Sequence, residues 1–541
     1  MNNMAWEKIP LNNDGASAAT FAAVNLCHDA GVAYADAANM ELHFIEMDRL
    51  TGVPHHGYCG GHGGRVYTRL ESVIRDEQLA ALYRVWLTAT HALGLDNVQW
   101  LLSPANPRGD RRLEDGLEEK LGMHAAWCRL AHVDAVGVDH QRAHAADVVA
   151  VNNMTDGTVV VLDGMGDGCG AAFAVNPKGE LTELHRRRAL SLGELYEVLT
   201  KFFVGANAYG LALGREGTFM AFAGLGKPTV PMNAEWRRII TAFTTDYPWA
   251  GNGAEQFMCQ VLADLVERHD HKDVAATCHQ LWVDLAEEYV LTYADQTKPL
   301  ALAGGSALNC ALNARLARRW GGCVCWSPTP GDCGQPVGMV VHELMRRGVD
   351  ARGWRLRTTG VLDDVQVTGG VADPERVARL LASGQVVATV RGEVEAGPRA
   401  LGRRSILASP LVAEHRQTLN HLKGREAFRP FGVIIPREHM ADFTDLDVDA
   451  PWMNLTVDVE HGQVPAAVHA DGTVRVQTVT AQADPWLHAL VTAFGDATGV
   501  YAVINTSLNT KGKAIFNRVG DALELLGHGV DALVVDDVLV T

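Results

Sequence analysis

Two short apolar runs in the sequence each end in a glycine-containing turn. Residues 158–162 (TVVVL) run into DGMGDG at 163–168, and residues 300–303 (LALA) run into GGSALN at 304–309. A third turn, LCHDAG at 26–31, lies between two apolar segments. Glycine lets a turn direct backbone N–H groups at one anion. One such turn is more often purely structural, so the prediction of phosphate binding depends on the three together.

The second turn also opens a predicted helix at 307–318, whose N-terminus favours phosphate. Three such turns, two of them with aspartates, fit the actin/hexokinase-like ATPase architecture, in which two related halves close over a nucleotide. Acidic side chains in such a cleft can serve magnesium or another metal. The candidate nucleotide-binding residues are Asp29, Gly164, Gly166, Asp167, Gly304, Gly305 and Asn309.

The chain is long enough, at 541 residues, to require more than one domain. Short β-branched runs alternate with amphipathic stretches such as 256–270 and 274–294, which predicts an α/β (α+β) protein. A polar, glycine-containing segment at 355–373 predicts the connection between a large N-terminal domain, 1–355, and a C-terminal domain, 356–541.

Residues 139–147, DHQRAHAAD, place two histidines four positions apart. On a helix, His140 and His144 share one face, so both rings can reach one ion. Asp163, at the end of the next predicted strand, and Asp332, in the turn PGDCGQ, are candidate carboxylate partners. Two imidazoles and two carboxylates suit iron(II), zinc or manganese. The alternatives are a surface helix flanked by histidines, and aspartates that cap helices or form turns.

Arginines are concentrated in the segment 391–432, around the single lysine, Lys423, between Lys298 and Lys511. Guanidinium groups bind phosphate and carboxylate oxygens in a bidentate manner. These charges alternate with glycine, proline and apolar residues, which favours the walls of a cleft over a solvated surface. The candidate residues here and downstream are Arg399, Lys423, Arg425, Arg429, Arg475, Asn505 and Ser507.

The formal net charge of −17 disfavours a nucleic-acid-binding protein, which needs a concentrated basic patch. The N-terminal residues lack the basic and apolar regions of a signal peptide, and no apolar run is long enough to span a membrane. The ten cysteines form no paired CxxC motifs. These features predict a cytoplasmic protein with reduced thiols. They do not predict its oligomeric state.

Several motifs occur together in a specific order and spacing. The sequence resembles the O-carbamoyltransferases of antibiotic and nodulation-factor biosynthesis, the family of the tobramycin, cephamycin and NodU enzymes. The resemblance covers nearly the whole chain. The motifs that carry it include HQRAH (140–144), LDGMGDG (162–168), GGSALN (304–309), GDCGQPVG (331–338), GPRALGRRSILASP (397–410), LKGREAFRPFG (422–432) and NTSLNTKG (505–512).

The resemblance implies an N-terminal domain like the tRNA threonylcarbamoyl transferase and a C-terminal YrdC-like domain. Carbamoyl phosphate would bind the basic residues of the C-terminal domain and yield carbamate, which ATP, with Mg²⁺, converts to carbamoyladenylate. The N-terminal domain would pass the carbamoyl group to a hydroxyl of a small-molecule acceptor. By the same resemblance, His140, His144, Asp163 and Asp332 would hold Fe(II) or another divalent metal, and His28 would be catalytic.

Two segments depart from the family pattern. EGTFMAFA at 216–223 has Thr218 where the family usually has a lysine, and GKAI at 512–515 has Lys513 where the family usually has a glutamate. The first change alters the segment expected to contact the nucleotide or the acceptor, and the second reverses a charge beside the expected carbamoyl phosphate pocket. Neither change removes a proposed ligand, and no motif selects the acceptor.

Three alternative functions remain open. A hydrogenase-maturation carbamoyl transferase would carry paired CxxC motifs and place its YrdC-like domain first. A tRNA carbamoyl transferase would need a basic surface. A non-catalytic nucleotide-binding scaffold could use the same fold without turnover.

Overall fold

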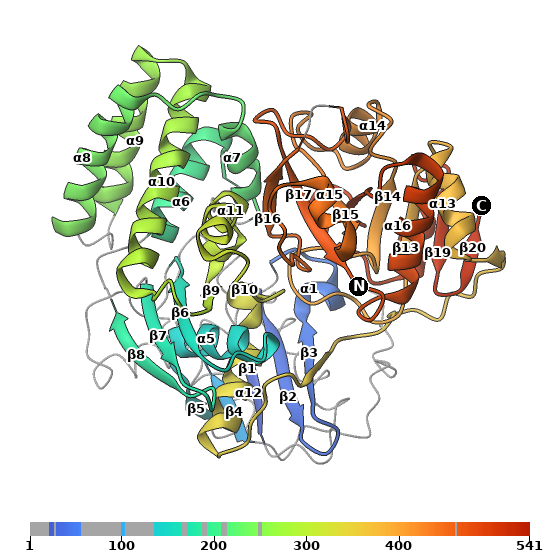
Figure 1. Cartoon of the computed structure of the whole chain (residues 1–541), viewed down its shortest axis with the longest axis horizontal. Coiled ribbons are helices and arrows are strands. Elements are labelled where there is room, and N and C mark those ends of the chain that lie inside the picture. Colours follow the sequence, from blue (N-terminus) through green and yellow to red (C-terminus); the bar gives the residue numbers. More distant parts are fainter. Residues whose placement is uncertain are drawn as a thin grey trace, which may run out of the picture.

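The computed structural model describes residues 21–25, 29–55, 99–102, 135–164, 170–186, 192–206, 212, 214–246, 252–459 and 462–541. Two sheets with their helices form the N-terminal part, and a third sheet forms the C-terminal part (Figure 1). The predicted α/β class is confirmed by this mixture of strands and helices. Among the described residues, no helix combines the length and apolar character needed to cross a membrane.

The first sheet has the strand order β11-β3-β2-β1-β4-β5. Strands β1, β2 and β3 are antiparallel neighbours, and β4 and β5 continue parallel to β1. Strand β11 is added at the far edge, parallel to β3. The strands are β1 (Phe21–Asn25), β2 (Gly31–Asp36), β3 (Glu41–Glu46), β4 (Gln99–Leu102), β5 (Ala135–Gly137) and β11 (Arg355–Arg357).

The second sheet repeats this topology. Strands β6, β7 and β8 are antiparallel neighbours, and β9 and β10 continue parallel to β6. Three antiparallel strands followed by two parallel ones, in the same spatial order, make the two sheets related halves, as the glycine turns predicted. The strands are β6 (Gly157–Leu162), β7 (Gly170–Val175), β8 (Leu181–Arg186), β9 (Leu300–Ala303) and β10 (Val324–Trp326).

Helices α5 (His140–Val151) and α12 (Gln335–Arg346) pack against each other between the two sheets. Helix α12 contacts β1 and β2, whereas α5 contacts β6 and β9 (Figure 1). A Cβ atom on Gly338 would lie 1.9 Å from the carbonyl oxygen of Ala143, so the backbones meet directly at this position. This close approach fixes the helix that carries both histidines of the HQRAH motif.

Helices α6 to α11 pack on the side of the second sheet away from α5, whereas α1 lies beside β3 of the first sheet (Figure 1). The predicted helices 256–270 and 274–294 are observed with shifted ends, as α9 and α10. The helices are α1 (Met47–Thr51), α6 (Leu192–Val204), α7 (Glu216–Ala223), α8 (Val230–Asp246), α9 (Asn252–Arg268), α10 (His271–Tyr293) and α11 (Cys310–Trp320).

The predicted helix 307–318 begins later than expected. Residues Gly305–Leu308 form a 3-10 turn, and α11 starts at Cys310. The reason is local, because the Asn309 side chain accepts hydrogen bonds from the N–H groups of Ala311 and Leu312, both at 3.1 Å, and so caps the helix.

The C-terminal sheet has nine strands in the order β12-β20-β19-β13-β14-β18-β15-β17-β16. Helices α13 and α16 pack together over one face. The strands are β12 (Gly370–Val371), β13 (Val387–Val390), β14 (Arg404–Ala408), β15 (Gly432–Pro436), β16 (Leu455–Asp458), β17 (Thr473–Val479), β18 (Val503–Ser507), β19 (Ala532–Val535) and β20 (Val538–Val540). The helices are α13 (Pro374–Ala382), α14 (His415–Leu422), α15 (Met440–Phe443), α16 (Pro485–Thr498) and α17 (Val519–Leu523).

One hydrophobic core continues from the second sheet into the C-terminal sheet, through residues such as Val160, Trp320 and Ile406. The boundary predicted between 355 and 356 falls within β11, which pairs with the first sheet. The boundary itself stays a prediction.

Candidate functional site

Four side chains from distant parts of the chain meet between the two halves of the N-terminal part. His140 and His144 lie on α5, Asp163 follows β6, and Asp332 begins a 3-10 turn before α12. One ligand atom from each lies within 4.8 Å of those of the others. Both histidines are buried, and the two carboxylates are nearly so. The structure therefore brings together all four residues that the sequence suggested as metal ligands, and we call these four residues the metal-type cluster.

The separations between the ligand atoms suit a divalent ion. His140 Nε2 lies 3.2 Å from His144 Nε2, 2.9 Å from Asp163 Oδ2 and 3.5 Å from Asp332 Oδ1. His144 Nε2 lies 3.7 Å from Asp163 Oδ2 and 3.4 Å from Asp332 Oδ1. Ligands bonded to one ion at ~2.1 Å stand roughly 3.0–3.4 Å apart in octahedral or tetrahedral geometry. The donor set and its spacing thus fit a metal with nitrogen and oxygen ligands.

Local sequence explains how each ligand is held. The Asp139 carboxylate accepts a hydrogen bond from the Arg142 N–H at 2.8 Å, which starts α5 so that His140 is its first residue. The Gly305 N–H donates to Asp163 Oδ1 at 3.2 Å, which leaves Oδ2 facing the histidines. Gly304 has a positive φ of 85°, and a Cβ there would lie 2.3 Å from the Leu162 carbonyl oxygen. The glycine turn is therefore required by its contact with the strand before Asp163.

In this cluster, the histidine rings and the carboxylates change one another's pKa. Burial lowers the pKa of His144, but hydrogen bonds that its ring donates to Asp163 and Asp332 outweigh this effect and raise the pKa to about 9. Burial also raises the pKa of Asp163, yet its contacts with the two histidines hold it well below the usual range. A divalent cation in the cluster would take the place of the proton on His144.

A further buried carboxylate lies one helical turn after His144. Asp147 Oδ2 accepts a hydrogen bond from the Thr329 hydroxyl at 3.1 Å. Burial raises the pKa of Asp147 to about 7, against the opposing effects of Ser327, Thr329 and His144. Asp147 was not among the residues expected from the sequence, although a position three residues after His144 lies on the same side of α5.

Asp29, in the turn at 26–31, pairs with His55, a partner that the sequence did not predict. Asp29 has a positive φ of 58°, and its carboxylate lies 2.7 Å from His55 Nδ1. Asn25 Nδ2 donates to the carbonyl oxygens of Asp29 at 3.4 Å and Asp332 at 3.2 Å, so this turn is joined to the metal-type cluster. No local pattern connects His55 to Asp29, because they are brought together only by the fold.

Several candidate residues lie outside the described part of the chain: His28, Gly166 and Asp167. Gly164 is described and packs against α6, where a Cβ on Gly193 would lie 2.4 Å from the Cα of Gly164. Asn309 caps α11, and its Nδ2 lies 3.3 Å from Nε2 of the half-buried His279. The nucleotide-binding roles of these residues stay predictions.

The basic residues of the C-terminal part also converge. Arg475 on β17 is paired in register with Gly432 on β15, which is paired with Asn505 on β18. Ser507 points to the same side as Asn505, two residues further on. Lys423 follows α14 and is buried, and its Nζ donates to the backbone oxygens and side chains of Ser507 and Asn509 at 2.5–3.1 Å. We call Arg399, Lys423, Arg425, Arg429 and Arg475 the cation cluster.

The cation cluster has few acidic partners among the described residues. Burial, then Arg425 and Arg429, hold the pKa of Lys423 well below its ordinary value. Burial, followed by Arg475, lowers the pKa of Arg399 to about 10. Glu426 lies 3.9 Å from Arg429 and 3.2 Å from Arg215, so one carboxylate is shared. Excess positive charge in a buried position favours the binding of an anion.

Some polar atoms of the cation cluster also lack protein partners. Nε of Arg399, Nε of Arg475 and Oδ1 of Asn505 are buried and have no hydrogen-bond partner among the described residues. Cys310, at the start of α11, and Glu216, on α7, influence the pKa of Arg399. The C-terminal sheet also contacts the start of α11, directly after the glycine turn 304–309, because the Thr456 hydroxyl on β16 donates to the Cys310 carbonyl oxygen at 3.2 Å.

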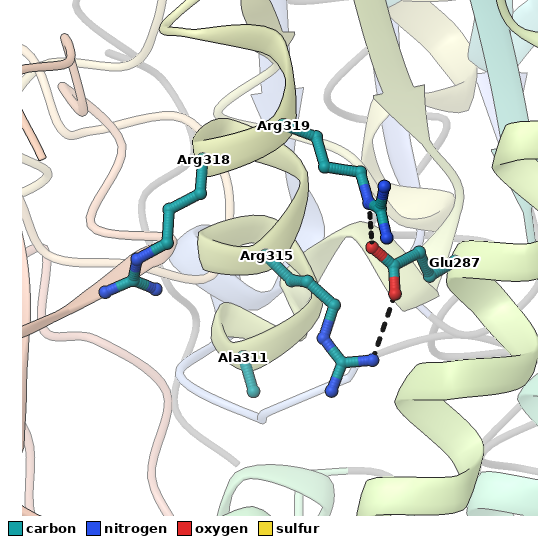
Figure 2. A pocket seen from close by; sticks show the side chains of 5 residues that line it. All are labelled: Glu287, Ala311, Arg315, Arg318 and Arg319. Atoms are coloured by element: carbon teal, nitrogen blue, oxygen red, sulfur yellow. Dashed lines mark hydrogen bonds and ion pairs between the residues drawn. The ribbon is translucent and has the colours of Figure 1, made fainter.

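A separate pocket of about 660 Å³ lies between α10 and α11, lined by the side chains labelled in Figure 2. Its arginines already have acidic partners. Arg315 Nη1 lies 2.5 Å from Asp284 and 3.0 Å from Glu287, and Arg319 Nε lies 2.5 Å from Glu287 (Figure 2). Because these charges are compensated, the pocket lacks the anion-binding character of the cation cluster.

The structure thus defines an α/β protein with a repeated half, a cluster of two histidines and two aspartates that could hold a metal ion, and a buried cation cluster. Family models place the chain more narrowly. The Carbamoyltransferase N-terminus model matches residues 113–341, and the Carbamoyltransferase C-terminus model matches residues 378–541. Together they cover more than half of the chain, which belongs to the carbamoyltransferase family.

Similar proteins include enzymes and nodulation proteins. The chain is 28% identical to nodulation protein NolNO of Sinorhizobium fredii, over 74% of this chain and 63% of that protein. It is 32% identical to 3'-hydroxymethylcephem-O-carbamoyltransferase of Amycolatopsis lactamdurans, over 50% of this chain and 54% of that enzyme. The matches thus span less than two thirds of these relatives.

Among solved structures, full-length HypF in a phosphate- and nucleotide-bound form is similar over 62% of this chain and 57% of that one, at 14% identity and a TM-score of 0.33. The ROK hexokinase of Thermus thermophilus is similar over 59% of this chain and 97% of that one, at 13% identity and a TM-score of 0.27.

Proposed function

We propose that this protein is an ATP-dependent O-carbamoyltransferase that moves the carbamoyl group of carbamoyl phosphate, through carbamoyladenylate, to a hydroxyl of a small natural product. The observation that carries the proposal is the cation cluster, whose buried charges have few acidic partners among the described residues. Family membership supports the carbamoyl group as the one transferred.

The first step of the proposed reaction takes place at the cation cluster. The basic side chains that bind the phosphate of carbamoyl phosphate are Arg399, Lys423, Arg425, Arg429 and Arg475. Lys423 also holds the Ser507–Asn509 turn beside it. Hydrolysis gives phosphate and carbamate. The carbamate oxygen then attacks the α-phosphorus of ATP, bound with Mg²⁺, and pyrophosphate leaves. Carbamate is a poor electrophile, so the adenylate supplies the leaving group for the transfer.

The second step belongs to the N-terminal part. His28 accepts the proton of the acceptor hydroxyl, whose oxygen attacks the carbamoyl carbon as AMP leaves. His140, His144, Asp163 and Asp332 would hold Fe(II) or another divalent metal, which supplies Lewis acidity when bound. Because carbamoyladenylate hydrolyses readily, we infer that both steps share one enclosed chamber.

The proposal is tested by incubating the protein with carbamoyl phosphate and ATP and measuring pyrophosphate. Release that requires both compounds is the expected result. Release from ATP alone, or none at all with either compound present, contradicts the proposal and favours a nucleotide-binding scaffold. Candidate acceptors with hydroxyl groups are then screened for a product heavier by one carbamoyl group.

A further inference from the structure

The loop that presents Arg399 is held at Gly397 by two residues of the N-terminal part. Glu46 Oε2 accepts a hydrogen bond from the Gly397 N–H at 3.1 Å, and Arg49 Nη2 donates one to the Gly397 carbonyl oxygen. Both polar groups of one backbone residue, two positions before Arg399, are therefore bound by side chains more than three hundred residues away in the sequence.

These two side chains form a buried pair at the end of the first sheet. Glu46 ends β3, and Arg49 lies in α1; they are 7% and 3% exposed, and Arg49 Nε lies 3.7 Å from Glu46 Oε2. Burial of a charged pair is unfavourable unless its hydrogen bonds are well satisfied. Here the backbone of Gly397 forms one hydrogen bond with each side chain, and Arg49 Nη1 also donates to Asp48 Oδ2 at 3.4 Å, so the pair and the loop stabilise one another.

The other end of the loop is held within the C-terminal part. Glu395 Oε1 accepts hydrogen bonds from the N–H groups of Leu401 at 2.7 Å, Arg403 at 2.7 Å and Arg404 at 3.0 Å. Asn505 Nδ2 donates to the Ala400 carbonyl oxygen at 2.9 Å. Arg399 thus lies between hydrogen bonds formed within the C-terminal part and hydrogen bonds formed with the N-terminal part.

Gly397 also contacts the segment that precedes the metal-type cluster. Its φ is +84°, and a Cβ atom there would lie 2.0 Å from the Pro328 carbonyl oxygen. Thr329, the next residue, donates to Asp147 of α5. The junction at Gly397 is therefore in contact with both the first sheet and the turn that leads to Asp332.

We propose that Arg49, together with Glu46, is a positioning residue for carbamoyl phosphate: by holding Gly397 across the boundary between the two units, it places Arg399 in the cation cluster. Arg49 touches no substrate and acts through the loop. The proposal rests on the proposed function, and it makes the C-terminal anion site dependent on docking of the N-terminal unit.

The test uses the full chain and the KM for carbamoyl phosphate in the pyrophosphate-release assay. Arg49→Met is expected to raise this KM by about 10- to 100-fold, because displacement of a positioned group by about 1 Å has effects of that size. Arg49→Lys, which keeps the charge and a donor, should recover part of the loss. Arg357→Met is the matched control, since Arg357 also joins the two units, through Glu41 at 3.0 Å and Glu393 at 2.5 Å, without touching the loop backbone.

A double-mutant cycle separates positioning from general damage. If Arg49 acts through Arg399, then Arg49→Met has no further effect on KM in an Arg399→Ala background. Additive effects, or a wild-type KM in Arg49→Met, overturn the proposal. If Arg49→Met does not fold, Glu46→Gln and Arg49→Lys are measured by the same criteria. A wild-type protein without carbamoyl-phosphate-dependent turnover overturns the proposed function itself, and this inference with it.

Discussion

The metal-type cluster and the cation cluster differ in how their charges are balanced. In the metal-type cluster two imidazoles face two carboxylates, so the charges compensate one another without any ligand. In the cation cluster five basic side chains meet, and Arg429 shares Glu426 with Arg215. The Nε atoms of Arg399 and Arg475 have no hydrogen-bond partner among the described residues. We infer that the first can keep its geometry when empty, whereas the second depends on its anion.

This difference matters for how each site can be tested. Substitution in the metal-type cluster should remove the metal without unfolding the protein. Removal of one positive charge from the cation cluster should reduce the repulsion between its side chains and also weaken anion binding. The predictions below separate these cases, from the largest expected effect to the smallest.

The double substitution His140→Ala/His144→Ala should abolish metal binding, because it removes both nitrogen ligands. The protein should stay folded. Elemental analysis and a thermal unfolding curve, with and without added Mn²⁺, measure both expectations. The surface histidines give a matched control, His269→Ala/His528→Ala. Full metal content in the first variant would show that the cluster is not a metal site.

His28→Ala should slow carbamoyl transfer by ~10²–10⁴-fold while pyrophosphate release continues, since a general base typically contributes that factor. Product formation and pyrophosphate are measured on one preparation. A parallel loss of both rates would mean that His28 supports the turn at 26–31 rather than the transfer step, and would remove the functional separation between the two regions.

Lys423→Ala should weaken binding of carbamoyl phosphate by about 2–5 kcal/mol, as expected when one charged partner is removed from an anion site. Because Nζ also holds the Ser507–Asn509 turn, the melting temperature should fall as well. Calorimetry and thermal unfolding measure the two effects, and Lys298→Ala, at an exposed ion pair, is the control. Unchanged affinity in Lys423→Ala would refute its place in the cation cluster.

Asp147→Asn tests the environment of the metal-type cluster through pH. The folded-state pKa of Asp147, about 7, lies above its ordinary value of 3.8, so its favourable contribution to stability is present at low pH and is lost as pH rises to 7. The variant should therefore gain stability relative to the wild type over this interval, by up to about 1.4 kcal/mol for each pH unit. Denaturant unfolding at pH 5 and pH 7 measures it. A difference that does not change with pH would contradict the burial of a carboxylate at this position.

Local patterns were sufficient for several elements. The runs 158–162 and 300–303 are strands β6 and β9, and the amphipathic stretches are helices α9 and α10. The helix after GGSALN began three residues later than predicted, because periodicity does not register that Asn309 caps it. A helix cap depends on one side chain, whereas the helix itself is marked by a repeat of apolar residues. Helix ends are therefore harder to predict from sequence than helices.

The sequence by itself determined which residues had the right chemistry: two histidines on one helical face, glycine turns after strands, and arginines around a single lysine. Only the tertiary structure decided how they are combined. It brought Asp163 and Asp332 to the histidines, His55 to Asp29, and Glu46 and Arg49 to Gly397. The physical reason is that side-chain spacing within one helix or strand follows from its backbone geometry, whereas contacts between distant segments depend on how the sheets and helices pack.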